Sequence, residues 1–360
     1  MAFVPYYTPG SEELARACAQ ALSRGECAIL QNHGVVTIGS TFQEAFNRFV
    51  TLEYLARSII NATQIRSTPI PLKESVLSTR NRSNATSLFL LPIKHCPHEH
   101  CCCAKRHISG KEKEIRAELC TLVKRAYDQE LFTASSGALS IRTQMSTTFN
   151  MYDSSRSGTS FLITPAQRDR SSVSLDEICY LSDRADCTMN TCDGRISPAS
   201  QGCHFHPSPS RGDRDSIITP SQSAEIHDKI YKIHPEINCI IIAQPKYATS
   251  FCITGSPFNS AQIPESYLVL GDVHYLPFES LHNAGDAIAR TLNPSAGITT
   301  VLVGGFGLIS IGINPLKTFV QVEVCESMCG VFLEASRRGP IVELSSDQLK
   351  EIDHCFKNGH

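Results

Sequence analysis

The spacing of apolar residues predicts a helix, strand, strand, helix unit at the start of the chain. A one-turn repeat of apolar positions over residues 14–22 predicts a helix that begins near Ser11 and ends at Gly25. The apolar run 27–30 and the apolar pair between Gly34 and Gly39 predict two short strands or a hairpin. A long amphipathic helix follows, because apolar residues again share one face: Phe42, Phe46, Phe49, Ala56 and Ile59.

The pattern breaks between about residues 63 and 110, where polar and turn-forming residues replace the periodic ones. Beyond this break, alternating helix and strand patterns predict a larger α/β unit. Residues 187–215 are polar and rich in turn formers, which predicts a surface loop, and Ser345 with Gln348 predicts the cap of a last helix through Ile352. The predicted helices cover 115–127 and 226–233. The segment 135–142 predicts a turn with a glycine that leads into a strand, and 161–165 predicts a strand ended by Pro165. Further predicted strands cover 237–242, 268–270 and 273–276.

One segment occurs twice in the chain. Residues 30–39 align without a gap on residues 303–312, and the second copy of the unit spans about 284–335. His33 in the first copy faces Phe306 in the second. An imidazole can bind a metal or transfer a proton, whereas a phenyl ring can do neither, so at most one copy keeps this chemistry. The same offset continues into the following helix and pairs two further residues: Phe46 with Phe319, and Glu53 with Glu326.

Composition narrows the functional classes. The 360 residues are 41% hydrophobic with a net charge of −2, which supports a buried core but gives no general attraction to nucleic acid or anionic lipid. No apolar run reaches the roughly 18 residues of a membrane span, and the start of the sequence has no secretory signal pattern. We therefore expect a cytoplasmic protein without nucleic-acid or membrane partners. The sixteen cysteines lack the spacing of a disulfide framework, which favours reduced thiols.

Four stretches of the longer unit resemble, in the same order, those of the class II aldolase and adducin N-terminal domain family. Residues 1–65 resemble the C-terminal half of the same fold and keep its Asn-His-Gly sequence at Asn32, His33 and Gly34. The resemblance implies an α/β fold of α-β-α architecture, with a central, mainly antiparallel sheet flanked by helices and preceded by a partial copy of the fold. The four stretches are Ser135–Arg142, Phe161–Pro165, Pro220–Ala248 and Val303–Glu326.

The resemblance also divides the chain into four parts. They are a partial aldolase-like half-domain at 1–65, a linker or insertion at 66–111, an aldolase/adducin-like long domain at 112–340, and a C-terminal helix and tail at 341–360. About 60 residues bury too little surface to close a core of their own, so we expect the half-domain to dock against the long domain or against another subunit.

Enzymes of this family cleave or epimerise sugar phosphates with a divalent metal, usually zinc. Three histidines hold the metal and a glutamate relays the proton. In the long domain, the resemblance places Ile242 and Gln244 at a His-x-His pair and Phe306 at the third histidine. Ser223 stands at the glutamate, with Glu225 two residues later, and Ala138 replaces an asparagine that helps to cradle phosphate. Because catalytic zinc needs about three protein ligands, we expect no bound cofactor in the long domain.

The half-domain presents the opposite defect. It retains His33, but it has no upstream segment to supply the other ligands or the glutamate. One interpretation is a turn residue held by hydrogen bonds; the alternative is a zinc ligand in a site completed by another segment or by another subunit.

Two further histidine groups are candidate metal ligands. The segment 95–103 is rich in thiol and imidazole groups, which suit zinc, but three adjacent cysteines do not all point into one tetrahedral site. The alternative interpretation is an ordinary loop. His204 and His206 imitate a His-x-His pair, but they lie in the loop predicted before Pro220. The candidate ligands of the first group are His95, Cys96, His98, His100, Cys101 and Cys103, with His107 after them.

Three functional hypotheses follow. The first is a catalytically degenerate family member, or pseudoenzyme, that serves as a structural or protein-interaction subunit with protein partners or as a homo-oligomer. The second is a zinc-dependent sugar-phosphate aldolase or epimerase with a site completed around His33. The third is a linker in which the Cys/His segment forms a zinc-stabilised contact module.

Overall fold

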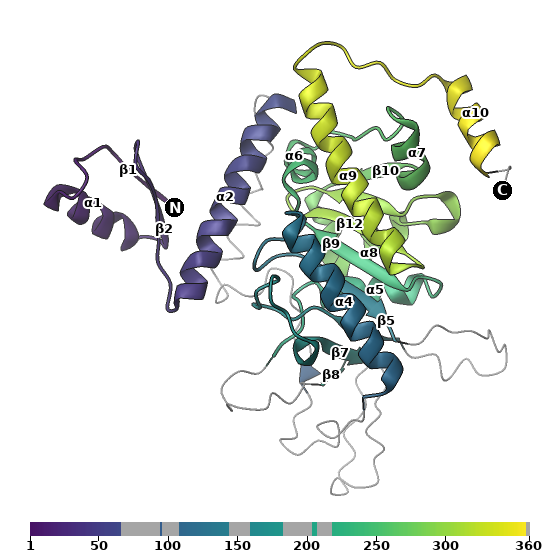
Figure 1. Ribbon diagram of the computed structural model, residues 1–360, viewed down its shortest axis with the longest axis horizontal. Coiled ribbons are helices and arrows are strands. Elements are labelled where there is room, and N and C mark those ends of the chain that lie inside the picture. Colours follow the sequence, from purple (N-terminus) through teal and green to yellow (C-terminus); the bar gives the residue numbers. More distant parts are fainter. Residues whose placement is uncertain (66–93, 96–107, 144–158, 183–203, 207–217, 358–360) are drawn as a thin grey trace, which may run out of the picture.

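A computed structural model of the protein describes residues 1–65, 94–95, 108–143, 159–182, 204–206 and 218–357. These residues form two sheets, a small one of three strands and a large one of nine. In Figure 1 the small sheet lies at one end of the molecule, and a long helix separates it from the large sheet. No described helix is long and apolar enough to cross a membrane.

The large sheet is mainly antiparallel, as the family resemblance implied. Its strand order is β10-β11-β12-β9-β5-β6-β7-β8-β4. Only two neighbouring pairs in it, β10 with β11 and β4 with β8, run parallel. The strands are β4 Lys94–His95, β5 Ala138–Arg142, β6 Ser160–Ile163, β7 Cys179–Ser182, β8 His204–His206, β9 Cys239–Ala243, β10 Val273–Leu276, β11 Thr300–Val303 and β12 Gly307–Gly312.

Helices cover both faces of the large sheet (Figure 1). Strand β9 shows why both faces are apolar: Ile240 and Ile242 point into one core cluster, and Ile241 points into the other. Successive side chains of a strand alternate between faces, so a continuously apolar run is typical of a strand covered on both sides. One face packs against α4 Gly110–Asp128, α6 Lys246–Thr254, α7 Pro264–Leu270 and α9 Pro315–Ser336, and the other against α5 Ala224–Ile233 and α8 His282–Thr291.

The remaining elements are short or terminal. Helix α10 begins after the reciprocal cap that the sequence predicted, in which the Ser345 amide donates to Gln348 Oε1 and the Gln348 amide donates to Ser345 Oγ. This helix, Ser346–Lys357, is longer than predicted. Among the described residues, three short 3-10 helices lie at Leu175–Glu177, Phe278–Leu281 and Pro294–Ala296.

The small sheet belongs to the half-domain. Its strand order is β1-β2-β3, with β1 parallel to β2 and β2 antiparallel to β3. Helix α2 extends from this sheet and packs against α6 of the long domain, where Ser58 and Ala62 are buried and Ser250 Oγ donates to the Ser58 carbonyl at 3.1 Å. The half-domain therefore docks within its own chain. Its elements are β1 Ala2–Val4, α1 Glu12–Leu22, β2 Cys27–Leu30, β3 Gly34–Thr37 and α2 Phe42–Ile65.

The structure corrects several predictions. Residues 268–270 belong to helix α7 and not to a strand; Pro264 at the first helical position is the signal for it. Strand β1 was not predicted. Residues 204–206 form strand β8, so they do not belong to a loop, and the rest of the loop predicted at 187–215 lies outside the described residues apart from these three. Most of the predicted linker, including residues 96–107, also lies outside the described residues.

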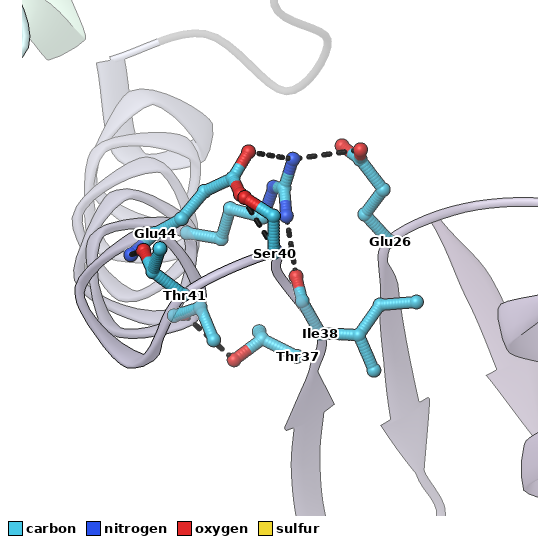
Figure 2. Close-up of polar contacts among 8 residues, drawn as sticks. Glu26, Thr37, Ile38, Ser40, Thr41 and Glu44 are labelled. Atoms are coloured by element: carbon cyan, nitrogen blue, oxygen red, sulfur yellow. Dashed lines mark hydrogen bonds and ion pairs between the residues drawn. The ribbon is translucent and has the colours of Figure 1, made fainter. Parts of the chain in front are cut away.

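One guanidinium fixes α2 to the strands that precede it. Arg48 donates one hydrogen bond to the Ile38 carbonyl. It also donates to the carboxylates of Glu26 and Glu44, both at 2.7 Å. Glu44 also accepts hydrogen bonds from the amide and the hydroxyl of Ser40. In Figure 2 the carboxylates of Glu26 and Glu44 and the carbonyl of Ile38 face one guanidinium; Glu26 directly precedes β2, Ile38 directly follows β3, and Glu44 lies in α2. These contacts set the angle at which the helix leaves the sheet.

Replacing Arg48 with Met should loosen this junction without unfolding the long domain. Because the carboxylate partners are partly exposed, we expect a loss of local stability of about 1 kcal/mol, which corresponds to roughly fivefold faster amide exchange in β3 and the first turns of α2. Hydrogen exchange with mass spectrometry measures this. The control is Arg16→Met, which removes an exposed ion pair with Glu12. Equal exchange in the two variants would contradict the assigned role.

Candidate functional site

A pocket of about 270 Å³ opens where several central strands of the large sheet end. It is lined by the segment before β5, by the loop after β6, by the start of α5, by the end of β9 and by the turn between β11 and β12. Four of the positions identified by the family resemblance, Ile242, Gln244, Phe306 and Ser223, line this pocket together with Ala138. Residues far apart in the sequence thus meet where the resemblance places one site.

Strand β9 and the β11–β12 turn form one wall of the pocket. Ile242 lies in β9 and Gln244 directly follows the strand. Because the two residues are two positions apart, their side chains point to the same face of the sheet. Phe306 sits in a tight turn in which its amide donates to the Val303 carbonyl at 3.1 Å. Gly307 has φ 138° and packs so closely on β9 that an added Cβ would lie 2.4 Å from the Ala243 carbonyl oxygen. Glycine is required there because the turn passes directly over the end of β9.

The start of α5 forms the opposite wall. Ser221 and Ser223 both line the pocket, and their hydroxyl oxygens are 3.1 Å apart. Glu225 lies in the first turn of α5 but does not line the pocket. The structure therefore does not bring this carboxylate to the family position that Ser223 occupies.

Arg170 is a pocket residue that sequence reasoning missed. Its guanidinium is almost fully buried and donates to the carbonyls of Gly137 at 3.1 Å and Pro165 at 2.8 Å. Burial lowers the pKa of this group to about 10. A backbone bridge between Pro165 and Pro220 brings the two loops together. Through Nε and Nη1, Arg170 therefore holds the floor of the pocket in place by hydrogen bonds to backbone carbonyls.

The chemistry of the lining is that of hydroxyls, amides and hydrocarbon. Ser135, Ser136, Gln167 and Gln222 add further polar groups, and Gln244 Oε1 is buried with no hydrogen-bond partner among the described residues. Apart from Arg170, the described lining residues carry no charged group and no imidazole. This arrangement can hydrogen-bond a small polar molecule, but it offers no general base.

The lining does not fit the zinc ion that the family fold implies. Zinc in proteins is held by thiolate, imidazole or carboxylate groups, and catalytic sites use about three of them. Ile242 and Phe306 provide no lone pair, and Gln244 provides a single neutral amide oxygen. The donor set at the family position is therefore inadequate for this metal.

His33 lies away from the pocket lining. It occupies the exposed turn between β2 and β3, where Asn32 has φ 57° and the His33 amide donates to the Leu30 carbonyl at 3.2 Å. Within the part of the chain that the structure describes, no three histidine, cysteine or acidic side chains gather closely enough to hold a metal.

The Cys/His segment lies largely outside the described residues. Its first candidate ligand, His95, ends strand β4, which pairs with β8 in a register that sets His95 opposite Phe205. The His204–His206 segment and the start of the Cys/His segment are therefore neighbours in the sheet. The other candidate ligands of the segment, Cys96, His98, His100, Cys101 and Cys103, are not described.

Comparisons with known proteins agree with the fold. A sequence model of the Class II Aldolase and Adducin N-terminal domain matches residues 1–60 and 117–333. The 3-oxo-tetronate 4-phosphate decarboxylase of Escherichia coli K12 is 39% identical over 56 residues, which is 16% of this chain and 26% of that protein. The chain thus aligns with only about a quarter of this curated relative.

Solved structures superpose on this chain, and the first of the following two shows the same architecture. An L-fuculose 1-phosphate aldolase from Glaciozyma antarctica PI12 superposes with a TM-score of 0.51 at 16% identity, over 71% of this chain and 85% of the other. YgbL from Escherichia coli, described as a putative aldolase/epimerase/decarboxylase, gives a TM-score of 0.48 at 17% identity, over 67% of this chain and 98% of the other.

Proposed function

Because the chain belongs to the class II aldolase and adducin N-terminal domain family, we propose that it is a family member that keeps the scaffold for protein interaction in the cytoplasm and has lost metal-dependent chemistry. The observation that carries this proposal is the pocket itself. The positions that would hold the metal and the proton carrier are Ile242, Gln244, Phe306 and Ser223, and they line one cavity without a suitable donor set or base.

The loss involves several roles at once, which supports a change of function. A single substituted ligand would weaken a metal site, whereas here all three ligand positions, the base position and the phosphate-cradle position at Ala138 differ from the family pattern. Hydrocarbon at two ligand positions leaves no site for the metal ion that would stabilise the negative charge of an enediolate.

The second candidate is a zinc-dependent sugar-phosphate aldolase, epimerase or decarboxylase. The chemistry named for the relatives favours it, and His33 is the ligand that it would use, in a site completed by another segment or by another subunit. The exposed position of His33 is compatible with such a shared site.

Metal analysis of the purified full-length protein separates the two candidates. We expect less than stoichiometric zinc at the pocket, and no retro-aldol cleavage or decarboxylation of sugar phosphates. Zinc bound at one ion per chain, whose removal by a chelator abolishes turnover and whose binding is lost in His33→Ala, would establish the second candidate instead.

A matched variant accounts for zinc bound by the Cys/His segment. In the variant Cys101→Ser/His98→Ala, zinc held by the 95–103 segment is lost, whereas zinc held at the pocket or at His33 remains. Unchanged metal content and thermal stability in this variant would rule out the zinc-stabilised contact module.

A further inference from the structure

The half-domain repeats the C-terminal part of the long domain element by element. The order β1-α1-β2-β3-α2 corresponds to β10-α8-β11-β12-α9, and the pairing is the same: the first two strands are parallel and the last two antiparallel. The sequence alignment that pairs residue 30 with residue 303 continues without a gap along both long helices. Each residue of α2 therefore has an equivalent in α9 whose surroundings are known.

The first difference between the copies is the far edge of the third strand. In the long domain, β12 pairs with β9 on this edge, in a register that places Leu308 opposite Ala243 and Ile311 opposite Ile240. Among the described strands, β3 pairs with β2 alone. Val35 and Ile38, which correspond to the fully buried Leu308 and Ile311, are 36% and 42% exposed. An open strand edge with apolar side chains is a template for another strand.

The second difference is the inner face of the long helix. Phe46, Phe49 and Ile60 are 39%, 46% and 62% exposed, whereas the equivalent residues, Phe319, Val322 and Leu333, are each 1% exposed. In the long domain that face packs into one core cluster with residues of three other elements: Leu122 of α4, Ile241 of β9 and Phe251 of α6. Within the residues that the structure describes, the half-domain has the core face of this helix without elements that cover it.

The third difference concerns a carboxylate. Glu326 of α9 accepts hydrogen bonds from the amides of Tyr247 at 3.0 Å and Ala248 at 2.8 Å, at the start of α6. A carboxylate is favoured there because the first amides of a helix are unpaired and carry partial positive charge. The equivalent Glu53 is about half exposed and bonds Arg57 on its own helix at 2.7 Å. Glu53 therefore has the position of a helix-capping carboxylate, and within the described part of the chain it bonds a side chain of its own helix instead of the start of another helix.

These residues form a preformed surface. Val35, Phe46, Phe49, Glu53 and Ile60, which lie on the α2 side of the small sheet, are called here the open face; Ile38 lies on the other side of the strand, as the equivalent Ile311 does in the long domain. The Arg48 contacts in Figure 2 fix the strand and the helix that carry them at a set angle. The opposite side of α2, with Ser58 and Ala62, is already buried against α6, so docking within the chain does not use the open face.

We propose that the open face binds a second polypeptide that presents an antiparallel strand followed by a helix, as β9 and α6 do in the long domain. The strand of this partner extends the small sheet at β3, its apolar side chains cover Phe46, Phe49 and Ile60, and the first amides of its helix reach Glu53. The proposal gives the interaction role proposed above a defined surface and rests on that role.

Charge argues against a second copy of the chain as the occupant. Glu53 lies midway between Phe46 and Ile60, so a two-fold pairing of two open faces brings two carboxylates together at its centre. The strand-helix unit of another copy is also engaged already, because its β9 is paired on both edges and its α6 is capped by Glu326.

A peptide probe tests the proposal on the full-length protein. The probe is the segment 236–255 of the chain, which contains β9 and α6, made with a lysine tail and a fluorescent label. We expect saturable binding by fluorescence anisotropy and slower hydrogen exchange at residues 35–39 and along the inner face of α2. The variant Phe49→Asp should weaken binding by roughly tenfold or more, as loss of a central apolar anchor does at interfaces.

Control variants separate docking from loss of structure. Glu53→Gln keeps the size of the side chain and should weaken binding only a few-fold, since it removes the charge that caps a helix. Val331→Asp introduces the same charge at an exposed apolar position of α9 and should leave binding unchanged. Circular dichroism and thermal melting confirm that each variant is folded.

Three outcomes would overturn the proposal: no saturable binding, binding that Phe49→Asp leaves intact, or binding without protection of residues 35–39. A concentration-dependent dimer of the unliganded protein, abolished by Phe49→Asp in sedimentation, would also overturn it and assign the open face to a second copy. Each of these results is independent of the metal and activity measurements. The proposed docking surface can therefore be wrong while the proposed loss of catalysis is right, and the loss of catalysis can be wrong while the docking surface is right.

Discussion

The triple variant Ile242→His/Gln244→His/Phe306→His is expected to bind about one zinc ion per chain. The three positions line one pocket. Positions 242 and 244 point to the same face of the sheet at the end of β9, and position 306 lies in the turn beside that end. Three imidazoles facing one cavity with a free coordination position are the usual ligand set of catalytic zinc. At these three positions the wild-type chain offers one amide oxygen, so the expected gain in zinc affinity spans several orders of magnitude. Metal analysis after dialysis measures the stoichiometry, and competition with a chelating dye gives the affinity.

A non-ligating variant at the same positions, Ile242→Leu/Gln244→Leu/Phe306→Leu, is the matched control. Both triple variants are best made in the Cys101→Ser/His98→Ala background, so that the Cys/His segment contributes no metal. A folded histidine variant that holds no more zinc than the leucine variant would show that the pocket no longer has the geometry of a metal site. The proposal that only the donor atoms have been lost would then be wrong.

Adding Ser223→Glu to the histidine variant extends this argument to catalysis. Ser223 lines the same pocket from the start of α5, and a glutamate there restores a group that can carry a proton. Metal binding alone does not require it. A difference in turnover, and not in zinc content, is therefore the expected signature of position 223.

Strong periodicity made most of the fold predictable from the sequence. Strands β5, β6 and β9 and helices α2 and α4 were predicted because each is a sustained apolar pattern. The run 268–270 was misassigned because three apolar residues fit one turn of a buried helix as well as they fit a strand. Strand β1 was missed because it has three residues and its partner β2 lies beyond α1.

Helix α2 shows a further limit of pattern reading. The sequence correctly predicted a helix with an apolar face. In the structure, however, most of that face is exposed to solvent. Periodicity reports which side of a helix is apolar, but it carries no information about whether a covering element exists. Only the internal repeat, with the buried face of α9 as the reference, shows what is missing.

The site was predictable only in part. Alignment of the repeated and family-like segments identified Ile242, Gln244, Phe306 and Ser223, and the structure brings these residues to one pocket. Arg170 was missed because its role depends on the bridge between Pro165 and Pro220. That contact joins segments far apart in the sequence, so no local pattern of charge or hydrophobicity predicts it.

Acid should destabilise the long domain strongly through a buried histidine. His227 of α5 is fully buried, and its Nδ1 lies 2.7 Å from Ser140 Oγ on β5. Ser140 Oγ is in turn 2.9 Å from the Tyr231 hydroxyl, which donates to the Asn238 carbonyl at 3.2 Å. A consistent chain of donors runs from His227 Nδ1 through Ser140 and Tyr231 to Asn238. Nε2 then keeps its lone pair, with no partner among the described residues.

Protonation of Nε2 would place a charge in this apolar core, so burial lowers the pKa of His227 from 6.5 to about 3. The unfolded chain therefore binds a proton between pH 6.5 and 3 that the folded chain does not bind, and the folded state loses stability as the pH falls through this range. One proton that is bound only by the unfolded chain changes the free energy of unfolding by about 1.4 kcal/mol for each pH unit. This group alone should therefore lower the free energy of unfolding by roughly 3–5 kcal/mol over that pH range. Urea unfolding at a series of pH values measures the slope.

The variant His227→Asn isolates this contribution from the carboxylates that titrate in the same range. Its side-chain amide can replace Nδ1 as the donor to Ser140, and it has no titratable group. We expect it to be less stable than the wild type at pH 7 by about 1–2 kcal/mol, because of the lost ring volume. Its free energy of unfolding should nevertheless fall less steeply below pH 6.5, so that the two curves converge or cross in acid. The exposed His274→Asn should leave the wild-type slope unchanged. Parallel curves for the wild type and His227→Asn would show that His227 is protonated in the folded protein, and the neutral imidazole assigned to this core would be wrong.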